Sequence, residues 1–145
     1  MSIFFKNKPE DFKGSLQVVT CFMEFEGSLL LLKRSSHCLA PHQWAIPGGK
    51  VEREETLNEA LERELNEELM ICIDWELTQL INYFYVRHSL TDYKLYLYQW
   101  RMCSLPHIQL NPNEHEDVMW CPKDQIHEVD LIEGQLEAFK FVYKD

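Results

Sequence analysis

The chain has 145 residues, a length typical of one folded domain with a buried core. Its hydrophobic content of 46% and charged content of 26% are those of an ordinary soluble globular protein. A net charge of −10 argues against a nucleic-acid polymer or an anionic membrane as the main partner, because both are negatively charged. A small anionic substrate remains compatible, since bound cations reverse the local field. We expect a single domain over residues 1–145, either a monomer or a homodimer.

The cysteines indicate a reducing compartment. They are scattered and show no CxxC pair, at Cys21, Cys38, Cys72, Cys103 and Cys121. An odd, irregular set of this kind is typical of free thiols and predicts a cytoplasmic protein. The first fourteen residues, MSIFFKNKPEDFKG, lack the long apolar stretch of a signal peptide, and no segment approaches the length of a membrane span.

The first third of the chain predicts strands and loops. Residues 16–25 (LQVVTCFMEF) and 28–33 (SLLLLK) are expected strands joined by a Glu-Gly turn, and residues 35–43 an expected loop. A short apolar segment, residues 44–46, follows. We expect the Pro-Gly-Gly run at residues 47–49 to interrupt regular structure.

The clearest helix is predicted over residues 56–69. Thr56 is followed three residues later by Glu59, the pattern of a capping box. Leucines recur every four residues and predict a buried stripe, at Leu57, Leu61, Leu65 and Leu69.

The rest of the chain predicts further strands and two helices, which makes the fold class α/β. Aromatic-rich strands are expected on either side of a turn at residues 89–92, and a short strand and a small helix opened by Pro122 precede a C-terminal helix. The expected ranges are strands 77–87, 93–102 and 118–121 and helix 133–143.

One face of the predicted helix is unusually acidic. Glu64, Glu67 and Glu68 are spaced i, i+3 and i+4, so they project from the same face, where like charges repel. At ~100° per residue this face borders the leucine stripe, whereas Glu59 and Glu62 point away from it. A cluster of carboxylates at the edge of a core supplies the hard oxygen ligands that Mg²⁺ requires. The sequence therefore predicts a metal-binding cleft beside this helix.

The same region resembles the Nudix box. Gly49, five residues, Glu55, seven residues and then R-E-L-x-E-E at residues 63–68 match the motif, which covers residues 49–71 here. The preceding WAIPGGKVE, residues 44–52, is similar to the family's lead-in strand and turn. The resemblance implies an α/β/α sandwich with a mixed β-sheet. It also implies hydrolysis of a nucleoside diphosphate linked to another group, with Mg²⁺ or Mn²⁺ as cofactor.

Two positions depart from the family pattern. Met70 stands where glycine is usual just past the helix, and a left-handed methionine costs roughly 1–2 kcal/mol. We therefore expect a reshaped helix end that shifts Glu68 slightly. Glu54 replaces a glycine that is common before Glu55. Neither change removes an expected ligand.

The resemblance assigns roles within the box. Glu64, Glu67 and Glu68 are the implied catalytic metal ligands, together with the carbonyl of Gly48. Supporting roles are implied for three more residues: Gly49 for close backbone approach, Glu55 for the turn, and Arg63 as a partner of a box glutamate.

Outside the box, the resemblance implies one more acidic ligand or general base before the last strand. Glu114 is the first choice and Glu116 the second. Substrate contacts are expected from Arg34, Lys50 and Gln135, the last against a purine edge.

Three functions remain open at this point. The chain layout is most similar to MutT-type 8-oxo-dGTP diphosphatases, which implies cleavage of an NTP or oxidised dNTP to the monophosphate and pyrophosphate. A Nudix hydrolase of a dinucleoside polyphosphate or nucleotide sugar is the alternative. A non-catalytic nucleotide-binding module is disfavoured, because degenerate members lose a box glutamate or the arginine and this chain retains them.

Overall fold

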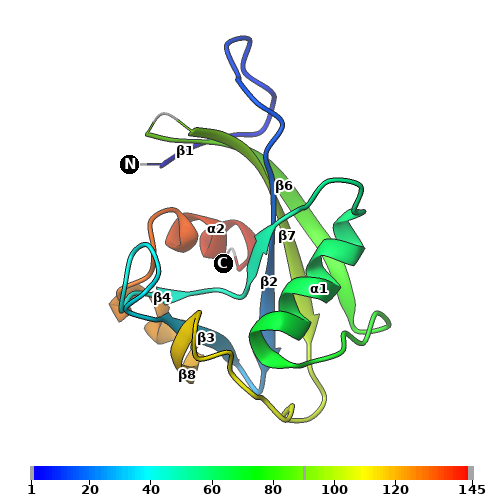
Figure 1. The fold of residues 1–145 in the computed structure, drawn as a ribbon, viewed down its shortest axis with the longest axis vertical. Helices are drawn as coiled ribbons and strands as arrows, with labels where there is room; N and C mark the ends of the chain where they lie inside the picture. Colours follow the sequence, from blue (N-terminus) through cyan, green and yellow to red (C-terminus); the bar gives the residue numbers. More distant parts are fainter. Residues whose placement is uncertain (1, 90, 144–145) are drawn as a thin grey trace.

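The fold is built around an eight-stranded mixed sheet (Figure 1). The computed structural model describes residues 2–89 and 91–143. The strand order is β1-β6-β7-β2-β3-β4, with β5 paired to β2 and β8 paired to β3. The β2–β7 pairing is parallel and the other pairings between these strands are antiparallel. The strands are β1 Ser2–Phe5, β2 Gln17–Phe25, β3 Ser28–Arg34, β4 Trp44–Ala45, β5 Gly48–Lys50, β6 Thr78–His88, β7 Thr91–Arg101 and β8 His115–Pro122.

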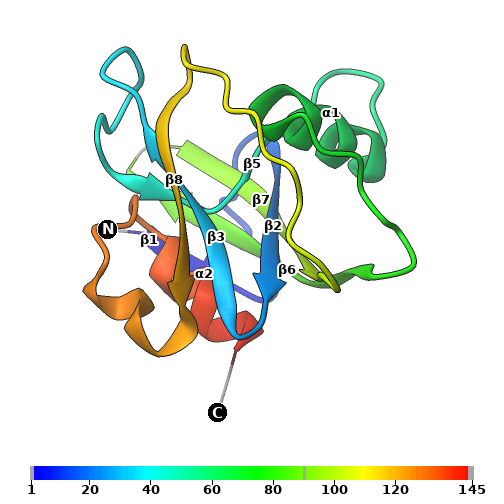
Figure 2. The same ribbon diagram turned by 90° about the horizontal axis from the view of Figure 1, so that it is seen from below.

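Helices cover both faces of this sheet. Helix α1 (Leu57–Leu69) lies on one face and α2 (Gln135–Val142) on the other, as Figures 1 and 2 show together. A 3-10 helix, η1 (Lys123–Glu128), connects β8 to the segment before α2. The expected α/β/α sandwich with a mixed sheet is therefore confirmed.

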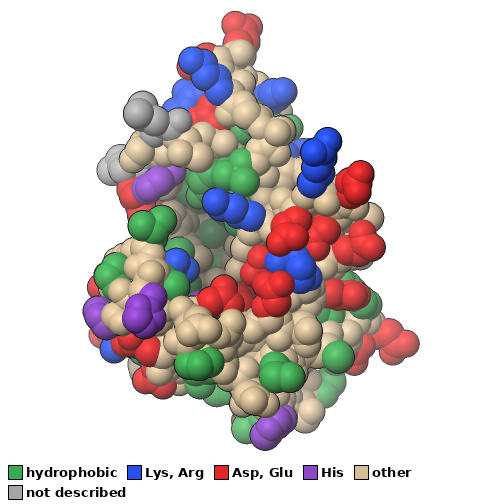
Figure 3. Space-filling model, viewed as in Figure 1, with side chains coloured by type: hydrophobic (Ala, Val, Ile, Leu, Met, Phe, Trp, Pro, Cys, Tyr) green, Lys and Arg blue, Asp and Glu red, His purple; other side chains and the backbone are tan. Residues whose placement is uncertain are grey.

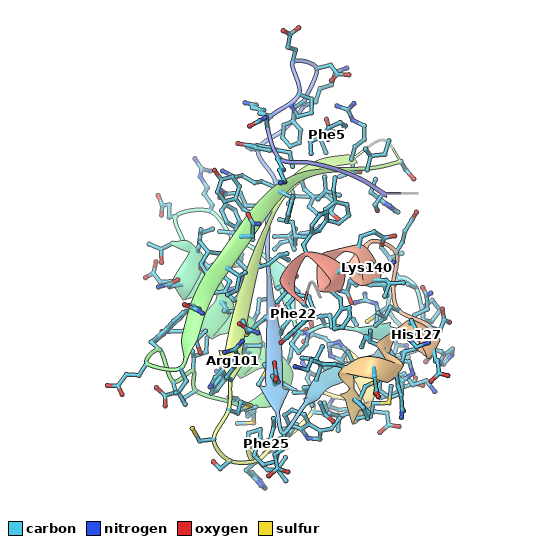
Figure 4. All side chains as sticks on the ribbon, turned by 180° about the vertical axis from the view of Figure 1, so that it is seen from behind. Phe5, Phe22, Phe25, Arg101, His127 and Lys140 are labelled. Carbon is cyan, nitrogen blue, oxygen red and sulfur yellow. The ribbon has the colours of Figure 1, made fainter. Side chains whose placement is uncertain are left out.

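Each face of the sheet has its own hydrophobic core. On β2, Val19 and Cys21 belong to the core under α1, whereas Phe22 belongs to the core under α2 (Figure 4). This division follows from the alternation of side chains along a strand. The leucine run of β3 is buried on both faces, because Leu30 packs toward α1 and Leu31 toward α2. The sheet is thus fixed from two sides, which holds α1 firmly over β2.

The predicted box helix is confirmed. The Thr56 side chain accepts a hydrogen bond from the Glu59 N–H at 3.1 Å, and the Glu59 carboxylate accepts from the Thr56 N–H at 2.9 Å. Leu61, Leu65 and Leu69 are fully buried under the helix. The start and the rotation of α1 about its axis are therefore fixed, and with them the direction of its acidic face.

The expected interruption at residues 47–49 is wrong for the glycines. Gly48–Lys50 forms β5, and Gly48 pairs with Thr20 of β2. A Cβ on Gly48 would lie 2.1 Å from the Val19 carbonyl oxygen. Glycine permits the close approach that pairing requires here, so the residues expected to break the sheet extend it.

The expected reshaping at Met70 is also wrong. Met70 adopts the left-handed conformation, with φ 55° and ψ 44°, and its N–H is bonded to the Leu65 and Asn66 carbonyls. Its side chain is 60% exposed, so the conformation meets no steric obstacle from the core. Glu54 likewise takes a positive φ of 70°. Helix α1 therefore ends as it would with glycine, and the acidic face keeps its register.

Other differences concern the ends of elements. Strand β1 was not expected and pairs with β6, β7 begins at Thr91, and β8 begins at His115. The C-terminal helix is shorter than expected at both ends. Of the expected turn at residues 89–92, position 90 lies outside the described residues. Pairing partners that are distant in sequence decide these ends, so local patterning does not reveal them. None of the helices in the described ranges is long and apolar enough to cross a membrane.

Candidate active site

Glu68 is the most deeply buried carboxylate of the box. Its side chain is 7% exposed and lies on the edge of α1 that faces β5. The Gly48 N–H donates to Glu68 Oε1 at 3.1 Å, and His115 Nε2 lies 3.7 Å from Glu68 Oε2. The carboxylate is therefore placed between the glycine strand and the start of β8.

Glu64 occupies the space next to Gly49. A Cβ on Gly49 would fall 2.3 Å from the Glu64 carboxyl carbon, so any larger residue at this position displaces that carboxylate. The Glu64 side chain is 13% exposed. The second glycine of the pair is therefore required by a box side chain, in contrast to Gly48, which is required by the β2 backbone.

Arg63 connects the box glutamates to the turn before α1. Its guanidinium donates to both carboxylate oxygens of Glu55, at 2.7 and 3.0 Å, and to the Lys50 carbonyl at 2.9 Å. It also contacts Glu64 at 2.9 Å and Glu67 at 3.3 Å. The hydrogen bond with Arg63 lowers the pKa of Glu55, whose carboxylate also accepts the Glu52 N–H. The expected pairing of Arg63 with box glutamates is thus present.

Glu114 faces the box from the loop before β8. Its carboxylate accepts from the Asn111 side chain at 3.0 Å, and its backbone carbonyl accepts the Ser35 N–H at 3.0 Å. Burial is the main cause of the raised pKa of both Glu64 and Glu68, and the negative charge of Glu114 adds to it in each case. Glu116, the second choice, instead pairs with His42 at 2.9 Å and Lys33 at 3.6 Å. The structure brings Glu114 to the acidic cluster and directs Glu116 elsewhere.

Burial and neighbouring carboxylates disfavour the ionised forms of Glu64 and Glu68. Burial raises the pKa of Glu68 well above its ordinary value, and the nearby Glu64 carboxylate adds to this effect. Burial also raises the pKa of Glu64, against the opposing effect of Arg63. Figure 3 shows acidic side chains gathered over α1 next to a hollow in the surface. A cation at this position would favour the ionised carboxylates.

The donor set fits a hard divalent cation in its chemistry. It consists of carboxylates from α1 and the β8 loop, with the backbone of β5 beside them, and Mg²⁺ prefers such oxygen ligands. Among residues 2–89 and 91–143, no three acidic, histidine or cysteine side chains already converge into a metal-binding group. Arg63 holds Glu64 and Glu67 in this arrangement, so these two carboxylates turn toward the guanidinium.

The three expected substrate contacts lie in different settings. Arg34 donates to the Leu39 carbonyl at 2.6 Å. Burial raises the pKa of Glu68, and the positive charge of Arg34 opposes this effect only weakly. Lys50 has an exposed side chain on β5, directly beside the glycines. The Gln135 side-chain oxygen accepts the Ile46 N–H at 2.7 Å, which ties α2 to the segment before β5. Their contacts with substrate stay predictions.

His115 lies beside Glu68 at the candidate site and was not predicted from the sequence. It directly follows Glu114, and it is the first residue of β8, with a side chain that is 3% exposed. Burial lowers the pKa of His115 to about 4, and the charge of Arg34 adds to this effect. The signal available in the sequence was its place next to Glu114, at the start of an alternating strand.

A mixed sheet between two helices, with a glutamate helix packed on a paired glycine strand, defines the class of Nudix hydrolases. The family model described as NUDIX domain matches residues 15–142. The chain belongs to the Nudix family and is a Nudix pyrophosphohydrolase.

Three known proteins show how far the similarity extends. The CTP pyrophosphohydrolase of Escherichia coli (strain K12) is 30% identical over 129 residues, which cover 86% of this chain and 90% of that protein. The nucleoside triphosphatase NudI of Enterobacter sp. (strain 638) is 29% identical over 131 residues, covering 84% of this chain and 92% of that protein. A MutT Nudix hydrolase from Burkholderia pseudomallei superposes with a TM-score of 0.77 at 22% identity, covering 90% of this chain and all of that one.

Proposed function

We propose that the protein hydrolyses a nucleoside triphosphate, or an oxidised deoxynucleoside triphosphate, to the monophosphate and pyrophosphate with Mg²⁺ or Mn²⁺ as cofactor. The observation that carries this proposal is the buried Glu68 carboxylate, held by the Gly48 N–H among the negative charges of Glu64 and Glu114. A buried carboxylate among like charges is unfavourable, and either a proton or a bound cation relieves it. Two relatives whose names describe nucleoside triphosphate hydrolysis support the substrate class.

Glu64, Glu67, Glu68 and Glu114, with the Gly48 carbonyl, would hold the cation. When bound, it lowers the pKa of a water molecule and neutralises charge on the phosphates. The residues of the chain position the carboxylates that would hold the cation. Gly48 orients Glu68 through its N–H, and Arg63 anchors the middle of α1 to the β5 backbone through the Lys50 carbonyl.

The remaining residues act on water and substrate. Glu114, on the loop before β8, orients the attacking water or accepts its proton. Arg34 and Lys50 offer positive charge to the phosphates, and Gln135 offers an amide to the base. The water oxygen forms a bond to phosphorus while the bond from phosphorus to the bridging oxygen breaks, and pyrophosphate leaves.

A panel of substrates tests this proposal. Purified protein with Mg²⁺ is incubated with canonical and oxidised nucleoside triphosphates, dinucleoside polyphosphates and nucleotide sugars, and the products are identified by anion-exchange chromatography and mass spectrometry. We expect a nucleoside monophosphate and pyrophosphate from at least one triphosphate. Cleavage confined to dinucleotides or nucleotide sugars would replace the triphosphate with the alternative substrate class. Saturable nucleotide binding without cleavage would indicate a non-catalytic module.

A further inference from the structure

We propose that His115 positions Glu68 for the cation and so sets the metal affinity of the site. This inference rests on the proposed function, because it takes Glu68 to be a metal ligand. His115 is a positioning residue here: it acts through the carboxylate that it faces.

Glu68 has two supports, one hydrogen bond and one close contact that is longer than a hydrogen bond. One carboxylate oxygen, Oε1, accepts the Gly48 N–H at 3.1 Å. The other, Oε2, lies 3.7 Å from Nε2 of His115. The first support comes from the backbone of β5 and the second from a ring on β8, so the carboxylate is held between two strands that pair with different neighbours. Removal of the ring would leave Oε2 without its facing group.

The His115 ring is itself held firmly in place. Its backbone N–H donates to the Asn111 carbonyl at 3.0 Å, and the residue pairs with Arg34 where the β3–β8 register shifts. Both side chains of the facing pair are almost completely buried, at 3% exposure for His115 and 7% for Glu68. The ring therefore has little freedom to move away from the carboxylate.

The other ring nitrogen of His115, Nδ1, indicates that the residue is present for more than packing. Nδ1 of His115 is buried and has no hydrogen-bond partner in the described part of the chain. A buried polar atom without a partner costs stability, and an apolar side chain would fill the same space without that cost. A residue kept only for packing would therefore be apolar. We therefore infer that the imidazole acts through the nitrogen that faces Glu68.

Groups that orient metal ligands have large effects on affinity. Loss of such an outer partner typically weakens metal binding about 10–100-fold, because the ligand no longer rests in the binding orientation. Glu64 and Glu67 have Arg63 as their partner, and Glu68 has Gly48 and His115. Gly48 contacts Glu68 through its backbone N–H, whereas His115 contacts it through its side chain. A substitution at position 115 therefore removes this contact without a change in the backbone.

The test compares H115L with H115Q. Leucine fills the space without a donor, whereas the glutamine amide places an N–H near the position of Nε2. The readout is the dissociation constant for Mn²⁺ on the full chain, measured by the electron paramagnetic resonance signal of free Mn²⁺, with thermal melting alongside. We expect H115L to weaken Mn²⁺ binding by about tenfold or more and H115Q to stay near wild type. The exposed His127, changed to leucine, is the matched control and should have no effect.

The outcomes separate this inference from the proposed function. If wild type binds Mn²⁺, E68Q does not, and H115L binds as wild type does, the positioning role alone is overturned. If wild type itself fails to bind Mn²⁺, the metal site and the role of His115 fail together. Should H115L not fold, the pair H115Q and H115N makes the same comparison, because the shorter asparagine amide does not reach Glu68. Equal affinities in that pair would contradict the positioning role.

Discussion

The two glycines before the box helix show how one residue type serves two purposes. Gly48 lies against the backbone of β2, and Gly49 lies against the carboxylate of Glu64. A side chain at position 48 would collide with the rigid backbone of β2, and one at position 49 would collide with the flexible end of the Glu64 side chain. The consequences of substitution should therefore differ in kind.

We expect G48A to lose stability and G49A to lose metal binding. The Gly48 Cβ would lie 2.1 Å from the Val19 carbonyl, so the β2–β5 pairing has to separate. The Gly49 Cβ would meet only the flexible end of Glu64, which can rotate away from its binding position. Urea unfolding and Mn²⁺ affinity, measured on both variants, check this. Equal losses of stability in the two would contradict the distinction.

We expect the substitution of Met70 by glycine to stabilise the folded protein. A left-handed methionine costs roughly 1–2 kcal/mol, and part of this is offset because glycine loses more entropy on folding. Since Met70 is largely exposed, M70G removes little packing, and we expect a net stabilisation of about 0.5–1 kcal/mol. M70A keeps the conformational cost and is the control. A gain in M70A equal to that in M70G, measured by urea unfolding, would point to another cause.

At the scale of elements, the β6–β7 hairpin carries an ion pair that depends on pH. The Arg87 guanidinium donates to both oxygens of Asp92, at 2.8 and 3.1 Å, and the Lys13 N–H donates to one of them at 2.8 Å. These hydrogen bonds, that of Arg87 first, lower the pKa of Asp92 to about 2, from an ordinary value of 3.8. The ion pair joins the hairpin to the segment before β2.

The direction of this shift fixes the direction of the pH effect. Because the folded state lowers the pKa, the stabilisation from ionised Asp92 is fully present above pH 3.8 and is lost as the pH falls through about 2. We expect D92N to be less stable than wild type at pH 7, with the difference shrinking below pH 3.8. Urea unfolding at pH 7, 3.5 and 2.5 measures it. The exposed Asp124, changed to asparagine, is the control; a constant deficit for D92N at all three values would contradict the assignment.

Sequence patterning predicted elements with strong local signals. The capping box at Thr56 and the leucine stripe predicted α1, and apolar runs predicted β2, β3, β6 and β7. Strand β1 and the glycine strand β5 were not predicted, because their pairing with β6 and β2 depends on residues that are distant in sequence. Met70 was misjudged for a related reason: only the structure shows that its side chain is free of obstacles.

For the candidate site, the sequence predicted where the box carboxylates lie, and their roles stay predictions. The spacing of the box glutamates implied a shared face, and the structure brings Glu114 toward them. The burial of His115 against Glu68 depends on the β3–β8 register, which no local pattern encodes. Residues that recognise the base lie outside the motif, so the sequence offers only candidates there.

At the scale of the whole molecule, the sheet brings distant segments to one place. Glu64 and Glu68 come from α1, the Gly48 N–H from β5, and Glu114 and His115 from the β8 end. Two cores hold these elements, one on each face of the sheet. A chain with a net charge of −10 gathers several carboxylates at the candidate site, and the cation that we propose there would make an anionic substrate compatible with this charge.

The most direct test of this account is the hydrolysis rate of E68Q beside wild type and E62Q, with and without Mg²⁺. Glu62 lies on the exposed side of the same helix and is the matched control. We predict Mg²⁺-dependent release of pyrophosphate from a nucleoside triphosphate by wild type and E62Q. E68Q should melt as a folded protein and show activity reduced by at least about 100-fold. Turnover by folded E68Q close to that of wild type, with Mg²⁺ present, would contradict the central role of the buried carboxylate.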